Sequence, residues 1–247
     1  MHKVLPIALA VICVLGIITG LVSASNINNP ITIQTNVNSD IPAASEAIEI
    51  ISTNLTRKIS SGQIQKYLPS FGYDSAATQL SIGTLMPLYT LYNTARDPAY
   101  CDALTREDFA FQSDVSEYGV FVYPSGKQDP ILFFTFIEKD NDWHQSSMST
   151  TAAGNGFGQN MNQYEKLAVT NQCGAPVVLW LFNDFALSFS LDGKQVVMPS
   201  TKMQHLLGLP AADGQPQVCA VDDFIERANE AISRFQNEKK TGQFSLG

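Results

Sequence analysis

The chain has 247 residues, of which 45% are hydrophobic and 15% are charged, and its formal net charge is −8 at pH 7. This apolar fraction is ordinary for a globular protein and excludes general disorder. No basic stripe offsets the acidic balance, so the sequence argues against binding to nucleic acid, whose phosphates repel a negative surface.

The first 24 residues have the composition of a signal peptide. His2 and Lys3 form a short basic start, and a mostly apolar run follows over residues 4–22. Small residues then have the spacing that signal peptidases require, which predicts cleavage between Ala24 and Ser25. The run also approaches the length of a membrane-spanning helix, so a retained membrane anchor is the alternative. Under both interpretations the rest of the protein is secreted or extracytoplasmic.

A polar linker rich in Asn, Ser and Thr is expected over residues 25–39, before a single domain over residues 40–240 and a tail over residues 241–247. The domain should begin with a helix near Asp40 that ends at residues 60–62. The apolar residues that predict this helix recur at helical spacing: Ile48, Ile51, Leu55 and Ile59.

The middle of the chain has the composition of strands. Residues 85–92 are rich in aromatic and aliphatic side chains, and residues 118–123 and 131–138 form two similar runs around a Pro- and Gly-containing turn. These two runs predict a hairpin with a long loop. Residues 141–158 are polar and then glycine-rich, which predicts an exposed excursion, and residues 159–169 can form a short helix.

A second hairpin is indicated further along the chain. Residues 177–182 are almost continuously apolar, and residues 185–191 alternate between large apolar and small side chains, as in a half-buried strand. Asp192 and Gly193 supply the positive φ angles of a tight turn. Residues 194–198 then form the strand that runs back beside the previous one.

The last expected element is an amphipathic helix with acidic residues at its start and basic residues at its end, where they complement the helix dipole: Asp222, Asp223, Lys239 and Lys240. The sequence therefore predicts an α+β domain. Its antiparallel sheet would have about five strands, made of two hairpins plus one strand, with the N-terminal and C-terminal helices on one face.

Three cysteines follow the export segment, and they allow one disulfide with three alternative pairings among Cys101, Cys173 and Cys219. Cys173 with a downstream His205 also has the residue types of a thiol hydrolase, in which an imidazole activates a thiolate. A catalytic cysteine is usually activated at a helix N-terminus, whereas Cys173 precedes a strand-like run. The catalytic interpretation therefore stays the alternative.

Two further groups of residues are candidate sites. Asp140, Asp142 and His144, with Ser146 and Ser147 nearby, are the ingredients of an activated nucleophile or of a calcium site, but a polar turn is the simpler interpretation. The glycines of residues 154–158 suit anion binding, yet their spacing fits no dinucleotide motif. Zinc-ligand spacing is also missing, so no metal and no cofactor is expected.

Aromatic residues in or beside the predicted sheet are the candidate binding residues: Tyr89, Tyr92, Tyr123, Trp143 and Phe157. Aromatic side chains with polar tips suit a groove that receives a protein, peptide or glycan, although core packing is the more ordinary role of aromatic residues in strands. Asn54-Leu55-Thr56 matches the pattern of a glycan acceptor.

The leading functional hypothesis is a non-catalytic extracytoplasmic binding or interaction module. It depends on the export signal, the acidic composition and the lack of a coherent catalytic set. The alternatives are a secreted cysteine-dependent hydrolase that uses Cys173 and His205, and a structural subunit of an envelope assembly anchored by residues 4–22.

Overall fold

The computed structural model of the chain describes residues 32–33, 44–91, 98–111, 115–127, 129–140, 142–150, 156–209 and 217–241. The strands in these ranges are β1 (Thr32–Ile33), β2 (Leu80–Thr90), β3 (Glu117–Pro124), β4 (Leu132–Lys139), β5 (Asp142–Ser149), β6 (Val177–Leu181), β7 (Asp184–Leu191), β8 (Lys194–Pro199) and β9 (Cys219–Ala220). The helices are α1 (Ala44–Ser60), α2 (Phe157–Thr170), α3 (Thr201–Leu206) and α4 (Val221–Thr241), with short 3₁₀-helices η1 (Gln65–Phe71), η2 (Pro98–Tyr100) and η3 (Arg106–Phe109). The predicted α+β class is confirmed.

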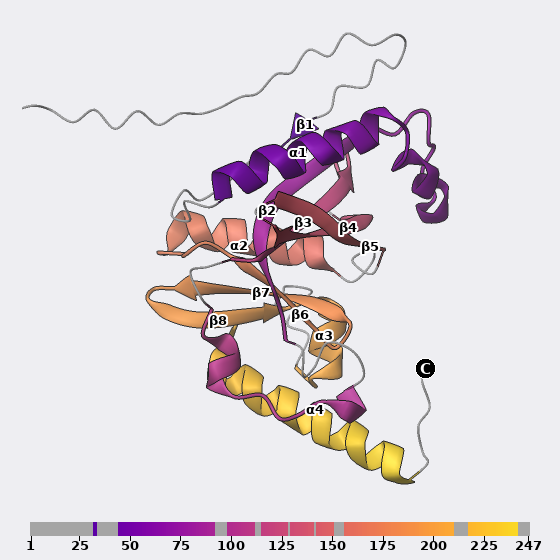
Figure 1. Ribbon diagram of the computed structural model, residues 1–247. Coiled ribbons are helices and arrows are strands. Elements are labelled where there is room, and N and C mark those ends of the chain that lie inside the picture. Colours follow the sequence, from indigo (N-terminus) through magenta and orange to yellow (C-terminus); the bar gives the residue numbers. More distant parts are fainter. Residues whose placement is uncertain are drawn as a thin grey trace, which may run out of the picture.

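The nine strands form one mixed sheet (Figure 1). Eight of them follow the order β5-β4-β3-β2-β6-β7-β8-β9, and β1 pairs with β2 outside this path. The pairs β1–β2 and β2–β6 are parallel, and the other pairs in the described residues are antiparallel. The prediction of an antiparallel sheet of about five strands is therefore wrong in two respects. The sheet has more strands, and two of its strand pairs are parallel.

Strand β2 joins the two halves of this sheet. Its first part, from Leu80 to Pro87, pairs with β3, and its last residues, from Leu88 to Thr90, pair with β6. We call β1 to β5 the N-terminal half-sheet and β6 to β9 the C-terminal half-sheet. The long strand β2 is thus hydrogen-bonded to a strand of each half-sheet.

Helices α1 and α4 cover the same face of the sheet, each over one half. Leu85 packs into the cluster beneath α1, whereas Tyr89 and Leu91 pack into the cluster beneath α4. These positions lie an even number of residues apart on or just after β2, so their side chains leave the same face of the strand. The arrangement of the first and last helices on one face agrees with the amphipathic patterns in the sequence.

The opposite face of the sheet folds onto itself around an aromatic core. The rings of Phe133 on β4 and Phe185 on β7 lie 4.5 Å apart between centroids, although three strands separate β4 from β7 in the sheet order. In a flat sheet four strand spacings would hold them about 19 Å apart. The half-sheets therefore face each other, and Phe157 of α2 completes the core by stacking on Phe121 at 4.1 Å.

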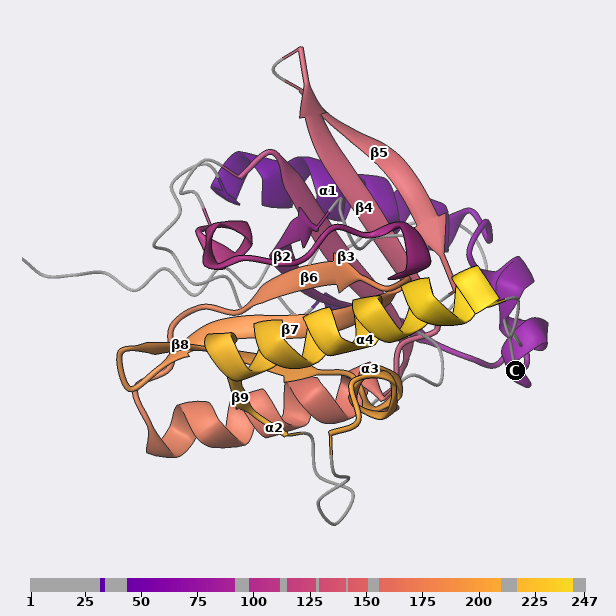
Figure 2. The same ribbon diagram turned by 90° about the horizontal axis from the view of Figure 1, so that it is seen from below.

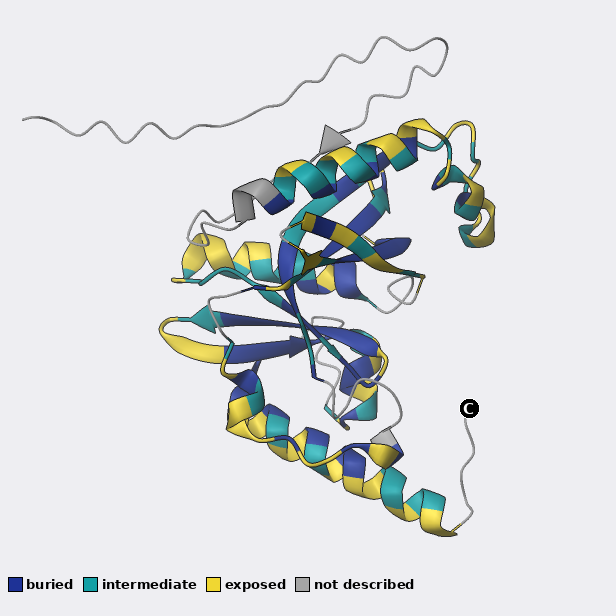
Figure 3. Cartoon of the chain, in the orientation of Figure 1, coloured by how far each residue is buried: buried dark blue, intermediate teal, exposed yellow. Residues whose placement is uncertain are grey.

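The resulting layers are α1, the N-terminal half-sheet, the C-terminal half-sheet and α4, with α2 beside the central core (Figure 1). Figure 3 shows that the outer sides of α1 and α4 are exposed and that the strands between them are largely buried. Figure 2 shows that the β4–β5 hairpin extends away from the body of the molecule.

The structure corrects the expected excursion at residues 141–158. Residues 142–149 form β5, which pairs with β4, and residues 157–170 form α2. The predicted turn at Asp192 and Gly193 is confirmed, because both residues have positive φ angles of 50° and 79°. The predicted signal peptide and linker, apart from Thr32 and Ile33 in β1, lie outside the described residues, as does the tail beyond residue 241.

Candidate functional site

The two candidate catalytic residues lie at opposite ends of β7. Cys173 forms a bridge with Leu191 at the end of β7, whereas α3, which carries His205, begins where the Ser200 N–H donates to the Phe185 carbonyl near the start of that strand. Six residues of strand separate Leu191 from Phe185, or about 20 Å. The structure does not bring the thiol and the imidazole together.

The surroundings of Cys173 also disfavour a thiolate. Burial, and then the nearby charge of Asp192, raise the pKa of the Cys173 thiol above its ordinary value. A nucleophilic cysteine needs the opposite shift, toward a lower pKa. The neighbouring Tyr164 hydroxyl donates to the Gly174 carbonyl oxygen at 2.9 Å, so it is engaged in holding the loop. This site has the properties of a structural cysteine.

The three cysteines of the described residues are free thiols, so none of the three expected pairings is formed. Cys101 lies beside Gln236, which donates to its carbonyl oxygen, whereas Cys219 lies in β9, two residues before the first residue of α4, Val221. The axis of α4 separates Gln236 from Val221 by about 22 Å, and a disulfide needs Cα atoms within about 7 Å. Cys173 packs with the aromatic core, on the sheet face opposite the cluster that holds Cys101 and Cys219.

Asp140 lies in a turn after β4, and the polar residues 142–147 lie in β5, the outer strand of the β4–β5 hairpin. Asp140 has a positive φ of 56° in the turn, and Asp142 lies 3.9 Å from the His144 ring nitrogen on exposed strand positions. Ser146 and Ser147 both hydrogen-bond to the Thr135 hydroxyl, at 2.5 and 2.7 Å, where β5 has a bulge. The histidine and the serines therefore have separate partners, and no relay connects them.

The candidate aromatic residues separate into different packing clusters. Tyr89 packs on Phe111 beneath α4, and Trp143 packs on Tyr118 beneath α1. Phe157 is fully buried in the central aromatic core. Tyr123 is partly buried and packs against the same core. Tyr92 lies outside the described residues. The described members of the set do not form one exposed surface.

A buried polar cluster was missed by the sequence analysis. The Ser200 hydroxyl donates to the Asp184 carboxylate at 2.7 Å and accepts from the Met203 N–H at 3.1 Å, which caps α3. Nearby, the Asn160 amide donates to the Met198 carbonyl at 2.9 Å. Because each contact joins a side chain to an adjacent element, the cluster holds α2 and α3 against the C-terminal half-sheet.

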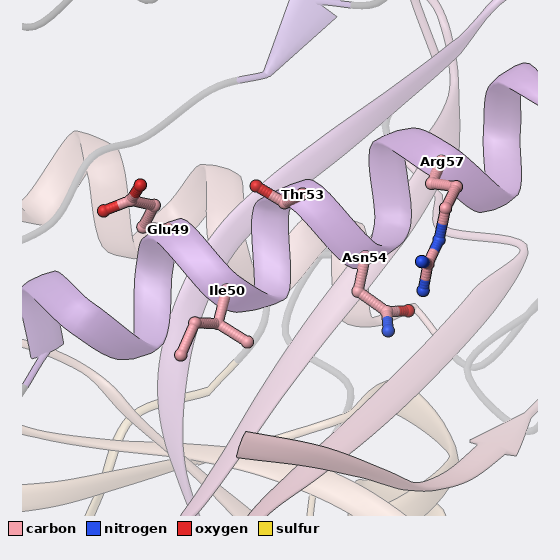
Figure 4. A pocket seen from close by; sticks show the side chains of 5 residues that line it. All are labelled: Glu49, Ile50, Thr53, Asn54 and Arg57. Atoms are coloured by element: carbon pink, nitrogen blue, oxygen red, sulfur yellow. The ribbon is translucent and has the colours of Figure 1, made fainter. Parts of the chain in front are cut away.

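The candidate binding site is an open groove of about 300 Å³ along α1. We call it the α1 groove, and it is lined by Glu49, Ile50, Thr53, Asn54 and Arg57 (Figure 4). The helix buries its other side in the core beneath it, through Ala47, Ile51, Leu55 and Ile59. The same amphipathic pattern that seats α1 on the sheet leaves Glu49, Thr53 and Arg57 exposed, whereas Ile50 and Asn54 are half-buried on the flank of the helix.

The α1 groove carries opposite charges near its two ends. Glu49 and Arg57 are exposed near its two ends, and Thr53 is exposed between them. The Asn54 side-chain oxygen Oδ1 is buried and has no hydrogen-bond partner. Because solvent does not reach this oxygen, a molecule bound in the groove would contact the exposed Glu49, Thr53 and Arg57 instead. The spacing of residues 49, 53 and 57 is the sequence signal that could have revealed this surface.

The matched glycan acceptor pattern falls in the middle of α1, where Asn54 borders the groove and Leu55 is fully buried. No group of three or more His, Cys, Asp or Glu residues that could hold a metal ion occurs in the described ranges. None of the helices in the described part of the chain is long and apolar enough to cross a membrane. Comparisons of the chain with protein-family models, curated proteins and solved structures found no match.

Proposed function

We propose that this protein is a non-catalytic, extracytoplasmic interaction module that binds a protein, peptide or glycan in the α1 groove. The observation that carries the proposal is the groove with the exposed, oppositely charged Glu49 and Arg57 near its ends, neither of which forms an ion pair within the described residues. These groups suit recognition by hydrogen bonds and charge. The export-type composition of residues 1–24 supports the extracytoplasmic location.

The arrangement of the former catalytic candidates supports binding over catalysis. Cys173 and His205 lie at opposite ends of β7, and the pKa of the Cys173 thiol is raised by burial. A hydrolase would need a nucleophile and a base within hydrogen-bond reach. We therefore expect a Cys173→Ser variant to keep the biological activity of the protein.

Site-specific photo-crosslinking in the producing cell tests the proposal. A photo-reactive phenylalanine analogue replaces Thr53 in the groove, and the matched control places it at Val169 on α2, which is 85% exposed. We expect a defined adduct from position 53 in the extracytoplasmic fraction and none from position 169. Mass spectrometry then identifies the bound molecule, and N-terminal sequencing of the same fraction should give a start at Ser25.

The proposal fails if position 53 gives no adduct beyond that of position 169. It also fails if the protein is recovered from the cytoplasm with residues 1–24 intact. Loss of activity in the Cys173→Ser variant with an unchanged melting temperature would favour the hydrolase alternative.

A further inference from the structure

The outward side of α1 carries a ridge with a symmetric charge pattern. Glu49, Thr53 and Arg57 are all exposed and follow one another at intervals of four residues, so they form a single ridge along the helix. Glu49 and Arg57 are equally far from Thr53 and about 12 Å from each other along the helix axis. Within the described residues neither charge forms an ion pair.

This pattern is complementary to itself when reversed. If two such helices pack antiparallel with the two Thr53 residues opposite each other, Glu49 of each lies opposite Arg57 of the other. In a two-fold symmetric interface each contact occurs twice with the partners exchanged, so both charge pairs form at once. The short Thr53 side chain at the crossing point allows the helices to approach closely.

We propose that the α1 groove receives α1 of a second copy of this chain, packed antiparallel across a two-fold axis at Thr53. This inference deepens the proposed function by naming the partner of the α1 groove, and it rests on that function. The two Glu49–Arg57 pairs set the direction and register, and the half-buried Ile50 and Asn54 lie on the flank of the contact. The dimer is reversible and sensitive to salt, because exposed ion pairs are weak and are screened.

Charge reversal tests this dimer by sedimentation velocity of the purified protein across a concentration series. Glu49→Arg alone or Arg57→Glu alone places like charges opposite each other in both pairs, and we expect a weakening of self-association by about tenfold. The double variant with both changes restores complementarity and should recover dimerisation. Reversal of Arg227 on α4, which pairs with Glu230 within its own chain, is the control and should have no effect.

A cysteine at the axis provides an independent readout. Thr53→Cys should give a disulfide-linked dimer under mild oxidation, because the residue lies opposite its own copy, whereas Val169→Cys should not. The proposal is overturned if the natural chain is monomeric at millimolar concentration in low salt, or if the double reversal fails to recover the loss in the single variants. A monomeric protein that still crosslinks another molecule at position 53 would overturn self-association and leave the proposed function standing.

Discussion

The side-chain amide of Asn229 on α4 forms two hydrogen bonds with the backbone of Leu104, accepting from the N–H at 2.7 Å and donating to the carbonyl at 3.0 Å. This pairing imitates one step of a β-ladder and fixes the segment before η3 against α4. Gln236 and Asp222 extend the same attachment, because they bond to Cys101 and Arg106. The segment thus runs antiparallel to α4 and is held along the helix.

We expect Asn229→Ala to destabilise the fold by about 1–3 kcal/mol, because both partly buried backbone groups of Leu104 lose their partners. Urea denaturation followed by circular dichroism measures this change. Asn237→Ala, at an exposed position on the same helix, is the control and should stay within about 0.5 kcal/mol of the natural chain. Equal effects of the two substitutions would contradict the role of the pair.

Gly119 on β3 leaves the space that the Phe133 ring occupies in the aromatic core. A Cβ atom added at this position would lie 2.5 Å from the ring, and Phe133 is only 1% exposed. We therefore expect Gly119→Ala to destabilise the fold by about 1–3 kcal/mol through overpacking. Calorimetry of Gly119→Ala, Phe133→Leu and the double variant checks this. The double variant should be more stable than the sum of the single effects predicts, and strict additivity would exclude the clash.

Glu117 at the start of β3 is half-buried, and burial raises the pKa of its carboxyl group. A raised pKa in the folded chain means that the neutral form favours folding below the unfolded pKa and that this contribution is lost as the pH rises through the folded pKa. We expect Glu117→Gln to be more stable than the natural chain at pH 7 and equally stable near pH 3.5. Melting temperatures across this range measure the difference. The exposed control Glu226→Gln should not show the same trend.

The thiol of Cys173 should react slowly with alkylating reagents at pH 7.5, because burial and Asp192 raise its pKa and leave little thiolate. Cys101 and Cys219 are buried and should become reactive only when the protein opens or unfolds. Mass spectrometry after timed alkylation distinguishes the three sites. If Cys173 were labelled faster than a free cysteine, this prediction would be contradicted and the hydrolase hypothesis would be supported.

Periodicity predicted the helices and the central strands, because α1, α4 and β7 bury their apolar side chains at regular intervals. It missed β5, whose outward residues are polar because the strand lies at the sheet edge beside β4 alone. It also missed the turn at Phe182 and Asn183, which have positive φ angles of 50° and 57°. Phenylalanine is a poor turn residue, but Phe182 buries its ring beneath α4, and that burial offsets the strained backbone.

The candidate site was the part of the molecule least accessible to sequence reasoning. The aromatic residues suggested a groove, yet Tyr89, Trp143 and Phe157 pack into three separate clusters. That outcome depends on how the sheet folds back at β2, which no local pattern encodes. The α1 groove uses ordinary surface residues, and the four-residue spacing of Glu49, Thr53 and Arg57 is a pattern that exposed helix faces commonly carry.

The shared strand β2 has a consequence for how the molecule loses its structure. Breaking the hydrogen bonds of β2 removes a neighbour from β3 and from β6 in the same event, and it opens the phenylalanine contacts between the layers. Neither half-sheet can therefore unfold while the other stays intact. Heating should therefore disrupt the molecule in a single cooperative transition, although its two outer helices never touch the same patch of core.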